Sequence, residues 1–314
     1  MERCDFLPVS AEEMHERGWW WYDALVVGGD AYVDHPSFGT AVISRVLEAE
    51  GLRVAVLAQP DWHDAEAFRA MGRPRLGVFI GAGNLDSMVA HYTAAKRRRS
   101  EDFYSPGKRS GCRPDRAAIV YCNRAREAFG SDMPIILGSL EASLRRFAHY
   151  DYWDDSVRRA ILFDAPADLL VYGMGEAATI EIAHRLKKKQ SVRTMTDIPG
   201  TGYITRDPSV CKFDHITLPS FEDVRDDKRL YAEATRTEYA EHDPIRGRAM
   251  IQPCEGRYLI ITPPAMPLDT KELDRVAELP YTREWHPMYE PLGGVPAIEE
   301  VRFSVIHNRG CFGG

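Results

Sequence analysis

The sequence predicts an α/β protein built on a doubly wound parallel sheet with a flavodoxin-like strand order. Five apolar runs have the length and composition of buried parallel strands. They cover residues 24–28, 53–57, 76–80, 134–137 and 169–172. Helical patterns alternate with these runs. Because crossovers between parallel strands are right-handed, we expect the helices to cover both faces of the sheet.

Helical patterns follow each of the strands, and two of them lie between the third and the fourth strand. They cover about 38–50, 63–71, 84–99, 115–129, 140–148 and 176–188. In the first pattern the apolar positions recur every three or four residues, as on the buried face of an amphipathic helix. Gly51 follows this pattern, at a position where glycine commonly ends a helix. The α/β alternation therefore extends over about the first 190 residues.

The second part of the chain has a different composition. Residues 190–220 are rich in threonine, proline and glycine, which favour turns and extended chain. We place a domain boundary there, with a flavodoxin-like domain at 1–200 and a connecting α+β segment at 201–299. The elements expected in the connecting segment are a charged helix at about 221–241, a hairpin over 250–262 around Glu255-Gly256, and a short helix at about 270–278.

The last stretch, residues 300–314, combines a strand pattern with an isolated cysteine. Val301, Phe303 and Val305 alternate with other residues, which predicts a strand at 301–307. Cys311 follows in the glycine-rich sequence Arg-Gly-Cys-Phe-Gly-Gly that ends at Gly314. Glycines around a thiolate suit a loop that wraps closely around a large group. We therefore expect the chain to be cut within a site that begins at Cys311.

Composition excludes several classes of protein. The net charge of −7 does not favour bulk attraction to nucleic acid or to an anionic membrane. No apolar run approaches the roughly 20 residues of a membrane span, and the N-terminus lacks the apolar core of a signal peptide. The six cysteines are scattered without C-x-x-C spacing, which argues against a zinc ribbon. We expect a cytoplasmic protein with free thiols and no membrane partner.

Ligands of an open α/β sheet bind at the carboxyl ends of its strands, so the loops there hold the candidate site residues. The loop after the first strand, 28–39, contains Asp30, Asp34 and His35. His35 has the chemistry of an axial metal ligand or a proton carrier. The alternative is a loop that caps the next helix and holds a hydrogen-bonded histidine. The loop is longer than the usual βα connection, which gives the two interpretations about equal weight.

Three further loops lie at the same edge. Gly81-Ala-Gly83 opens a helix, but the G-x-G-x-x-G spacing of a dinucleotide site is absent, so we predict a tight turn capped by Asn84. Glu141 follows the fourth strand and Glu176 begins the helix after the fifth, where a carboxylate is favoured. Residues 145–159 are dense in arginine, aspartate and aromatic side chains. They predict an ion-pair network, with a grip on an anionic substrate as the alternative.

These residues together suggest a family. Arg309-Gly-Cys-Phe-Gly-Gly314 resembles the start of the radical S-adenosylmethionine (SAM) signature C-x-x-x-C-x-x-C, and the rest of the chain is similar to the amino-terminal region of YgiQ-type radical SAM proteins. The stretches that carry the likeness are 6–8, 29–39, 58–62, 83–88, 113–116, 141–146, 149–153, 218–221 and 301–304. Stretches of this length and number are specific, and they cover nearly the whole chain.

The resemblance implies a function for the full-length protein. Cys311 would be the first of three thiolates that hold a [4Fe–4S] cluster, with the other two beyond this chain. SAM would bind the open iron and be cleaved to a 5′-deoxyadenosyl radical in an enzyme whose substrate is unknown. Strand 301–307 would begin a radical SAM partial barrel. The implied partners are that carboxyl-terminal barrel and a small electron-transfer protein such as flavodoxin or ferredoxin.

The resemblance also raises the question of cobalamin, because the predicted sheet is like that of cobalamin-binding domains. Two departures argue against this cofactor. Ser139 stands where these domains typically have a second glycine, and the loop at Asp34-His35 lacks their D-x-H-x-x-G spacing. Two alternatives to an enzyme fragment remain. Residues 1–200 could form a non-catalytic module that binds a corrinoid, flavin or nucleotide, or they could only dock onto the barrel.

Overall fold

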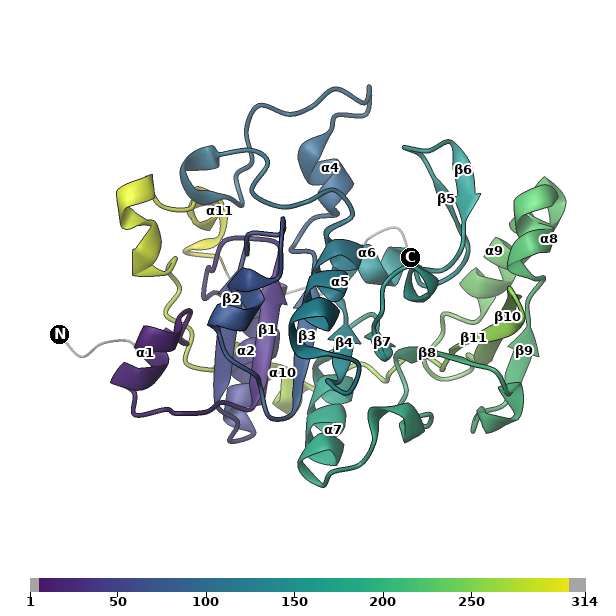
Figure 1. Ribbon diagram of the computed structural model, residues 1–314. Helices are drawn as coiled ribbons and strands as arrows, with labels where there is room; N and C mark the ends of the chain where they lie inside the picture. The colour runs from purple at the N-terminus through teal and green to yellow at the C-terminus, as the bar shows by residue number, and fades with distance from the viewer. Residues whose placement is uncertain (1–5, 305–314) are drawn as a thin grey trace.

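The computed structural model describes residues 6–304, which form a large mixed sheet flanked by helices (Figure 1). Nine strands lie in the order β2-β1-β3-β4-β7-β8-β11-β10-β9. Their bounds are β1 Ala24–Gly28, β2 Val54–Ala58, β3 Gly77–Gly81, β4 Ile135–Leu137, β7 Leu169–Val171, β8 Thr201–Thr205, β9 His215–Thr217, β10 Ala249–Cys254 and β11 Arg257–Ile261. The five strands of the α/β part are parallel and lie in chain order 2-1-3-4-5, which confirms the flavodoxin-like prediction.

The structure describes eleven α-helices, and those of the α/β part cover both faces of the parallel strands. Their bounds are α1 Ala11–Glu16, α2 Gly39–Ala49, α3 Glu66–Ala70, α4 Ser87–His91, α5 Ala117–Phe129, α6 Ser139–Leu144, α7 Glu176–Lys187, α8 Phe221–Asp226, α9 Lys228–Ala240, α10 Thr270–Ala277 and α11 Ile298–Val301. Helices α2 and α7 pack together on one face of the sheet, and α3 and α5 pack together on the other. Val26 therefore faces the first pair while its neighbours Leu25 and Val27 face the second, as strand alternation requires.

The register brings the loops of the candidate site to one level. Gly28 at the end of β1 pairs with Ala58 at the end of β2 and with Gly81 at the end of β3. The carboxyl ends of these three strands therefore lie side by side. The polar loops that follow them share one edge of the sheet, as the sequence predicted.

The sheet continues beyond residue 200. Strand β8 pairs antiparallel with β7, and the β10–β11 hairpin then extends the sheet. The hairpin turns at Glu255 and Gly256, both with positive φ, as predicted from these two residues. The predicted charged helix is divided into α8 and α9 at Asp227, whose extended backbone interrupts it. The domain boundary near residue 200 stays a prediction, since the strands on either side of it belong to one sheet.

Two predicted elements differ in the structure. The helix expected at 84–99 is limited to α4, and Asp86 rather than Asn84 caps it. Tyr92 ends α4 with extended backbone and pairs with Arg98, so the chain turns away from the helix axis. The strand expected from 301 does not begin there. Residues 301–304 form the end of α11 and a turn, because the amides of Arg302 and Ser304 donate to Ile298 and Val301. The rest of that strand and Cys311 lie outside the described residues.

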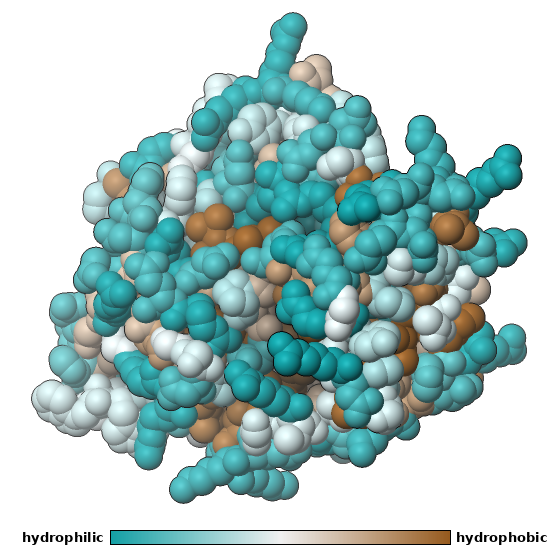
Figure 2. Space-filling model, turned by 45° about the vertical axis from the view of Figure 1, so that its right-hand side comes forward, coloured by the Kyte–Doolittle hydropathy of each residue, from teal (hydrophilic) through white to brown (hydrophobic). Residues whose placement is uncertain are grey.

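The final described segment returns to the first strand's loop. Val33 pairs with Trp285, and the ring of His286 lies against Phe6 and Tyr32. In Figure 1 the yellow segment accordingly lies beside the purple amino-terminal part. The described surface is mainly hydrophilic with small hydrophobic patches on the face shown in Figure 2. Within residues 6–304, no helix has both the length and the apolar character needed to cross a membrane.

Candidate functional site

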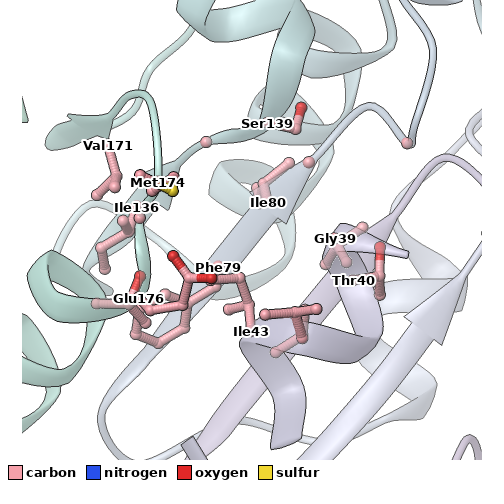
Figure 3. Close-up of a pocket in the computed structure, with 18 of the residues that line it drawn as sticks. Gly39, Thr40, Ile43, Phe79, Ile80, Ile136, Ser139, Val171, Met174 and Glu176 are labelled. Atoms are coloured by element: carbon pink, nitrogen blue, oxygen red, sulfur yellow. The ribbon is translucent and has the colours of Figure 1, made fainter. Parts of the chain in front are cut away.

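A cavity of about 530 Å³ opens at the carboxyl ends of β1, β3, β4 and β7 (Figure 3). This volume lies within the range of about 300–1,000 Å³ that is typical of small-molecule sites. Helices α2 and α7 and the sheet form its walls. The apolar lining comes mainly from Val26, Val42, Ile43, Phe79, Ile136 and Val171. The cavity is therefore a pre-formed, mostly apolar slot between the sheet and one helix layer.

Several glycines line this cavity. Gly39 begins α2, and a Cβ atom added there would meet no atom within 4 Å. Gly173 follows β7 with a φ of +69°, a conformation that favours glycine, and a Cβ there would also meet nothing within 4 Å. Gly138 lines the cavity at the end of β4. A side chain at Gly39 or Gly173 would therefore enter open space beside the cavity lining.

The polar groups of the cavity come from the first turns of the surrounding helices and from the loop before α2, which holds Ser37. They are Ser37, Thr40, Ser139, Glu176 and Thr179. Glu176 is the first residue of α7 and is 4% exposed, so its carboxylate belongs to the interior of the site. In Figure 3 it faces the same space as Phe79 and Ile43. Of the five carboxylate and histidine residues predicted for the site, Glu176 is the one that lines the cavity.

Asp30 lies in a separate, buried ion-pair cluster. Its Oδ1 accepts a hydrogen bond from Nη1 of Arg113 at 2.7 Å, and its Oδ2 accepts from the amide of Asn84 at 2.6 Å. Nη2 of Arg113 donates to Asp102 at 2.8 Å. Burial raises the pKa of the Asp30 carboxyl, and the Arg113 guanidinium opposes this effect. Asp30 therefore joins the loop after β1 to residues 102–113.

Asp34 and His35 also have partners within the fold. Asp34 accepts from Nη2 of Arg45 at 2.5 Å and from the amide of Thr282 at 2.9 Å. Nδ1 of His35 accepts from the amide of Ser37 at 3.1 Å, and the side chain is fully buried. Burial lowers the pKa of His35, so the ring is held neutral. His35 does not line the cavity, so its position does not fit an axial ligand to a corrinoid bound there.

Glu141 connects two helices beneath the site. Its carboxylate accepts from the amide of Ser87 at 2.9 Å and from the amide of Ala118 at 3.0 Å, in the first turns of α4 and α5. Burial raises the pKa of this carboxyl, and the nearby charge of Asp86 adds to the effect. Because Glu141 is 1% exposed and faces two helix amino termini, its observed contacts are structural.

The arginine-rich stretch after β4 forms the ion-pair network that the sequence predicted. Arg116 pairs with Asp151 and Asp154, and Arg158 also pairs with Asp154. Arg159 binds Asp164 and Glu255, while Arg145 binds Asp86. The small hairpin of β5 (His149–Asp151) and β6 (Ser156–Arg158) is fixed by these pairs. The charges thus have partners inside the protein.

Sequence reasoning did not select the hydroxyl residues of the cavity. The sequence marked Ser139 only as a departure from the glycine that related domains typically have. The structure explains why glycine is preferred at this position. Its φ is +74°, while its Oγ accepts a hydrogen bond from the amide of Ala82 at 3.0 Å. The signal available for Ser139 was its position just after a buried strand. For Thr40 and Thr179 the signal was the first turn of a predicted helix.

Metal binding within the described chain has no support from geometry. Among residues 6–304, no group of three or more histidine, cysteine, aspartate or glutamate side chains is arranged to hold a metal ion. Cys311, the predicted cluster ligand, lies outside the described residues. Its role therefore stays a prediction.

Comparison with known proteins supplies the family. A family model described as Radical SAM N-terminal matches residues 6–304. UPF0313 proteins of Clostridium botulinum (strain 657 / Type Ba4) and Clostridium perfringens (strain SM101) are 53% and 52% identical over 313 residues. The matches cover all of this chain but 49% and 47% of the relatives. The chain thus spans about half the length of the curated relatives it matches.

A solved structure gives a weaker likeness. It is the radical S-adenosylmethionine methyltransferase TsrM from Kitasatospora setae, with cobalamin and a [4Fe–4S] cluster bound. The match has 18% sequence identity and a TM-score of 0.37, and covers 57% of this chain and 26% of that one. These values are too low to transfer a ligand or a mechanism. The family match, by contrast, covers all of the described residues, and it confirms the resemblance to radical SAM amino-terminal regions. The chain belongs to the Radical SAM N-terminal family.

Proposed function

We propose that this chain is the amino-terminal portion of a radical SAM iron–sulfur enzyme and that Cys311 provides its first cluster thiolate. The observation that carries the proposal is the family match over 6–304 together with the Arg-Gly-Cys-Phe-Gly-Gly sequence that follows it. Thiolate is the usual protein ligand of iron in such clusters. A [4Fe–4S] cluster with an open iron supplies the reductive cleavage of SAM to a 5′-deoxyadenosyl radical.

The described residues would contribute position and protection rather than bond cleavage. The carboxyl edge of the sheet carries the cavity and the loops, so it is the side that would face the reaction centre. The partners that this function requires are the barrel in the remaining half of the protein and a small electron-transfer protein such as flavodoxin or ferredoxin. The substrate of the reaction is not specified by these residues.

Purification of the full-length protein without oxygen tests the proposal. We expect about four irons per protein and production of 5′-deoxyadenosine from SAM after reduction. Cys311→Ala should lose most of the iron and all of the 5′-deoxyadenosine. Cys112→Ala is the matched control, because Cys112 is a free, partly exposed thiol that should leave both unchanged. Full iron content and SAM cleavage in Cys311→Ala would reject the assignment.

The cavity supports a second, compatible function, in which the domain binds a small organic ligand. Its volume, its apolar walls and its place at the carboxyl ends of the parallel strands support this function. Ile43 is half-buried and projects into the slot from α2, so Ile43→Trp should fill the cavity. Absorbance titration of full-length protein with hydroxocobalamin and flavin mononucleotide tests the classes of ligand suggested by the fold. A spectral change that persists in Ile43→Trp would place the ligand elsewhere.

A further inference from the structure

The loop after α4 concentrates positive charge. Residues 93–112 form this basic loop, which extends beyond α4 at the top of the view in Figure 1. It contains six cationic and two acidic residues, so its formal charge of +4 contrasts with the −7 of the whole chain. The cationic residues, all of them exposed, are Lys96, Arg97, Arg98, Arg99, Lys108 and Arg109. Attraction of an anionic partner would therefore be local to this loop.

The positive charges of the basic loop are not compensated within the fold. Among residues 6–304, no carboxylate lies at ion-pair distance from any of the six cationic side chains. Lys96, for example, donates from Nζ to the carbonyl of Trp153 at 3.2 Å. A bond to a neutral carbonyl positions the side chain but leaves its charge available. Arg113 and Arg116, just after the loop, differ because both pair with aspartates.

The loop folds back on itself, which brings its cationic residues together. The backbone of Glu101 pairs with that of Arg109, so the two halves of the loop run side by side. One guanidinium nitrogen of Arg98 lies 3.6 Å from the position that a Cβ atom on Gly111 would take. Lys108 and Arg109 also line a hollow of about 510 Å³. The cations thus belong to one folded surface rather than to an extended chain.

Exposed aromatic rings lie among these cations. Phe103 is 45% exposed and Tyr152, at the tip of the β5–β6 hairpin, is 48% exposed. Nζ of Lys108 lies 4.8 Å from the ring centroid of Phe103, and Nζ of Lys96 lies 4.8 Å from that of Tyr152. The hydroxyl of Tyr152 donates to the carbonyl of Ala94 at 2.6 Å, which fixes the hairpin against the loop. Cations beside exposed rings are typical of surfaces that bind phosphates and stack bases.

The carboxylates beside this surface do not cancel its charge. Three exposed ones adjoin it: Glu101, Asp115 and Asp155. Asp115 accepts from the hydroxyl of Tyr92 at 2.8 Å, and Asp155 accepts from that of Tyr150 at 2.5 Å. An acidic protein would meet the same cations, but a nucleic acid also offers a planar base to each exposed ring. The combination therefore favours a nucleic acid.

We propose that the basic loop and the β5–β6 hairpin bind a single-stranded nucleic acid. Its phosphates would lie on the lysines and arginines, and its bases would stack on Phe103 and Tyr152. A single strand fits better than a duplex, because paired bases are stacked on one another and do not present their faces to a ring. The inference is independent of the cluster assigned to Cys311 and of any ligand in the cavity.

Fluorescence anisotropy on the full-length protein tests the class of partner. The probes are a labelled RNA of about 16 nucleotides, the DNA of the same sequence and the RNA paired with its complement. Unlabelled polyglutamate serves as the competitor that represents an acidic protein. We expect the single strands to bind more tightly than the duplex, with an affinity that falls as salt is raised. A preference for RNA over DNA of roughly tenfold or more would name RNA as the partner, and equal affinities would name single strands of either kind.

A charge variant locates the phosphates on the basic loop rather than on the other half of the protein. Arg97→Gln/Arg98→Gln removes two exposed cations that have no carboxylate partner. It should weaken binding and reduce the slope of log affinity against log salt by about 1.4, or about 0.7 for each lost contact. Lys188→Gln/Lys189→Gln is the matched control. It removes the same charge from exposed positions after α7, far from the loop in Figure 1, and should leave affinity and slope unchanged.

A ring variant tests the stacking of bases. Phe103→Leu keeps an apolar side chain without a ring, and it should weaken binding of the single strand by about fivefold or more. Phe103→Trp offers a larger ring and should retain the affinity. Tyr239→Leu removes a ring that is 70% exposed on α9 and is the control for loss of an exposed aromatic residue. Equal midpoints of urea unfolding in all variants would show that the fold is intact.

Several results would overturn the inference. Equal weakening in the variants of the loop and of residues 188–189 would show an effect of overall charge and not a site. Tighter binding of the duplex, or unchanged binding in Phe103→Leu, would contradict the stacking of bases. Displacement of the RNA by polyglutamate at equal charge would assign the surface to an acidic protein. If folded protein binds no oligonucleotide at about 50 mM salt while SAM is still cleaved, the inference fails and the assignment of Cys311 survives.

Discussion

The carboxyl edge of the sheet has two parts: one is closed by buried ion pairs and hydrogen bonds, and the other holds an open cavity. In the closed part, Asp30, Asp34 and Glu141 each meet an arginine or backbone amides at hydrogen-bond distance. In the open part, Glu176 lines about 530 Å³ of space between the sheet and helices α2 and α7. The two parts come from equivalent positions, since both follow the ends of parallel strands.

The difference separates residues that hold the fold together from a region that can bind a ligand. A buried carboxylate whose acceptors are filled by Arg113, or by the amides of two helices, fixes loops relative to each other and has no capacity left for a ligand. The open part instead leaves apolar space of a size that is typical of small-molecule sites. Polar residues at a strand end are therefore a weak indication of a binding site until their partners are known.

The largest effect should come from Arg113→Met. This change leaves the carboxylates of Asp30 and Asp102 buried without their shared cation, which should cost about 3–5 kcal/mol of unfolding free energy. Urea denaturation measures it. Arg73→Met removes an exposed pair with Asp132 and should change stability far less. Equal losses for the two variants would show that the closed part is not specially dependent on its buried charges.

Asp34→Asn should have a smaller effect. The amide keeps an acceptor for the Thr282 N–H but loses the charged pair with Arg45, which still retains Glu48. We expect a loss of about 2–3 kcal/mol. The same denaturation experiment measures it, and ligand affinity should not change. A loss of ligand affinity with unchanged stability would show that Asp34 belongs to the ligand site and not to the closed part.

Ser139 lies between the two parts and offers a finer comparison. Ser139→Ala removes the hydrogen bond from Ala82 but keeps the unfavourable φ of +74°, so it should cost about 1 kcal/mol. Ser139→Gly loses the same bond but relieves about 1 kcal/mol of backbone strain. Glycine should therefore be more stable than alanine by about 1 kcal/mol at this position in thermal or urea unfolding. The reverse order would contradict the left-handed conformation.

His35 should give the smallest effect, and it depends on pH. Burial lowers the pKa of His35 in the folded protein below its ordinary value of about 6.5. Below that pH the unfolded chain binds the proton more readily, so folding stability falls as the pH drops from 7 toward the folded pKa. Asn supplies an acceptor in place of Nδ1, so the unfolding free energy of His35→Asn should fall less steeply between pH 7 and pH 5.5. If the unfolding free energies of both proteins changed with pH by the same amount, His35 would be excluded as a source of the slope.

The strand order and most helices followed from local patterns in the sequence. The 2-1-3-4-5 order needs only alternating strands and helices with right-handed crossovers. The helix predicted at 84–99 was too long because its charged residues fit a helical pattern, whereas Tyr92 pairs with Arg98. The partners of Asp30 and Asp34 could not be predicted, since Arg113 is 83 residues from Asp30 and Thr282 is 248 residues from Asp34. The cavity could not be predicted either, because its lining comes from strands and helices that are far apart in the sequence.

A paired measurement on Asp34→Asn and Ile43→Trp tests the division of the sheet edge most directly. Unfolding free energy and affinity for hydroxocobalamin and flavin mononucleotide are measured on the same full-length preparations. We predict that Asp34→Asn loses about 2–3 kcal/mol of stability and keeps its affinity. Ile43→Trp should stay within about 1 kcal/mol of the parent protein and lose binding. The opposite pattern, with binding lost in Asp34→Asn and retained in Ile43→Trp, would contradict the account.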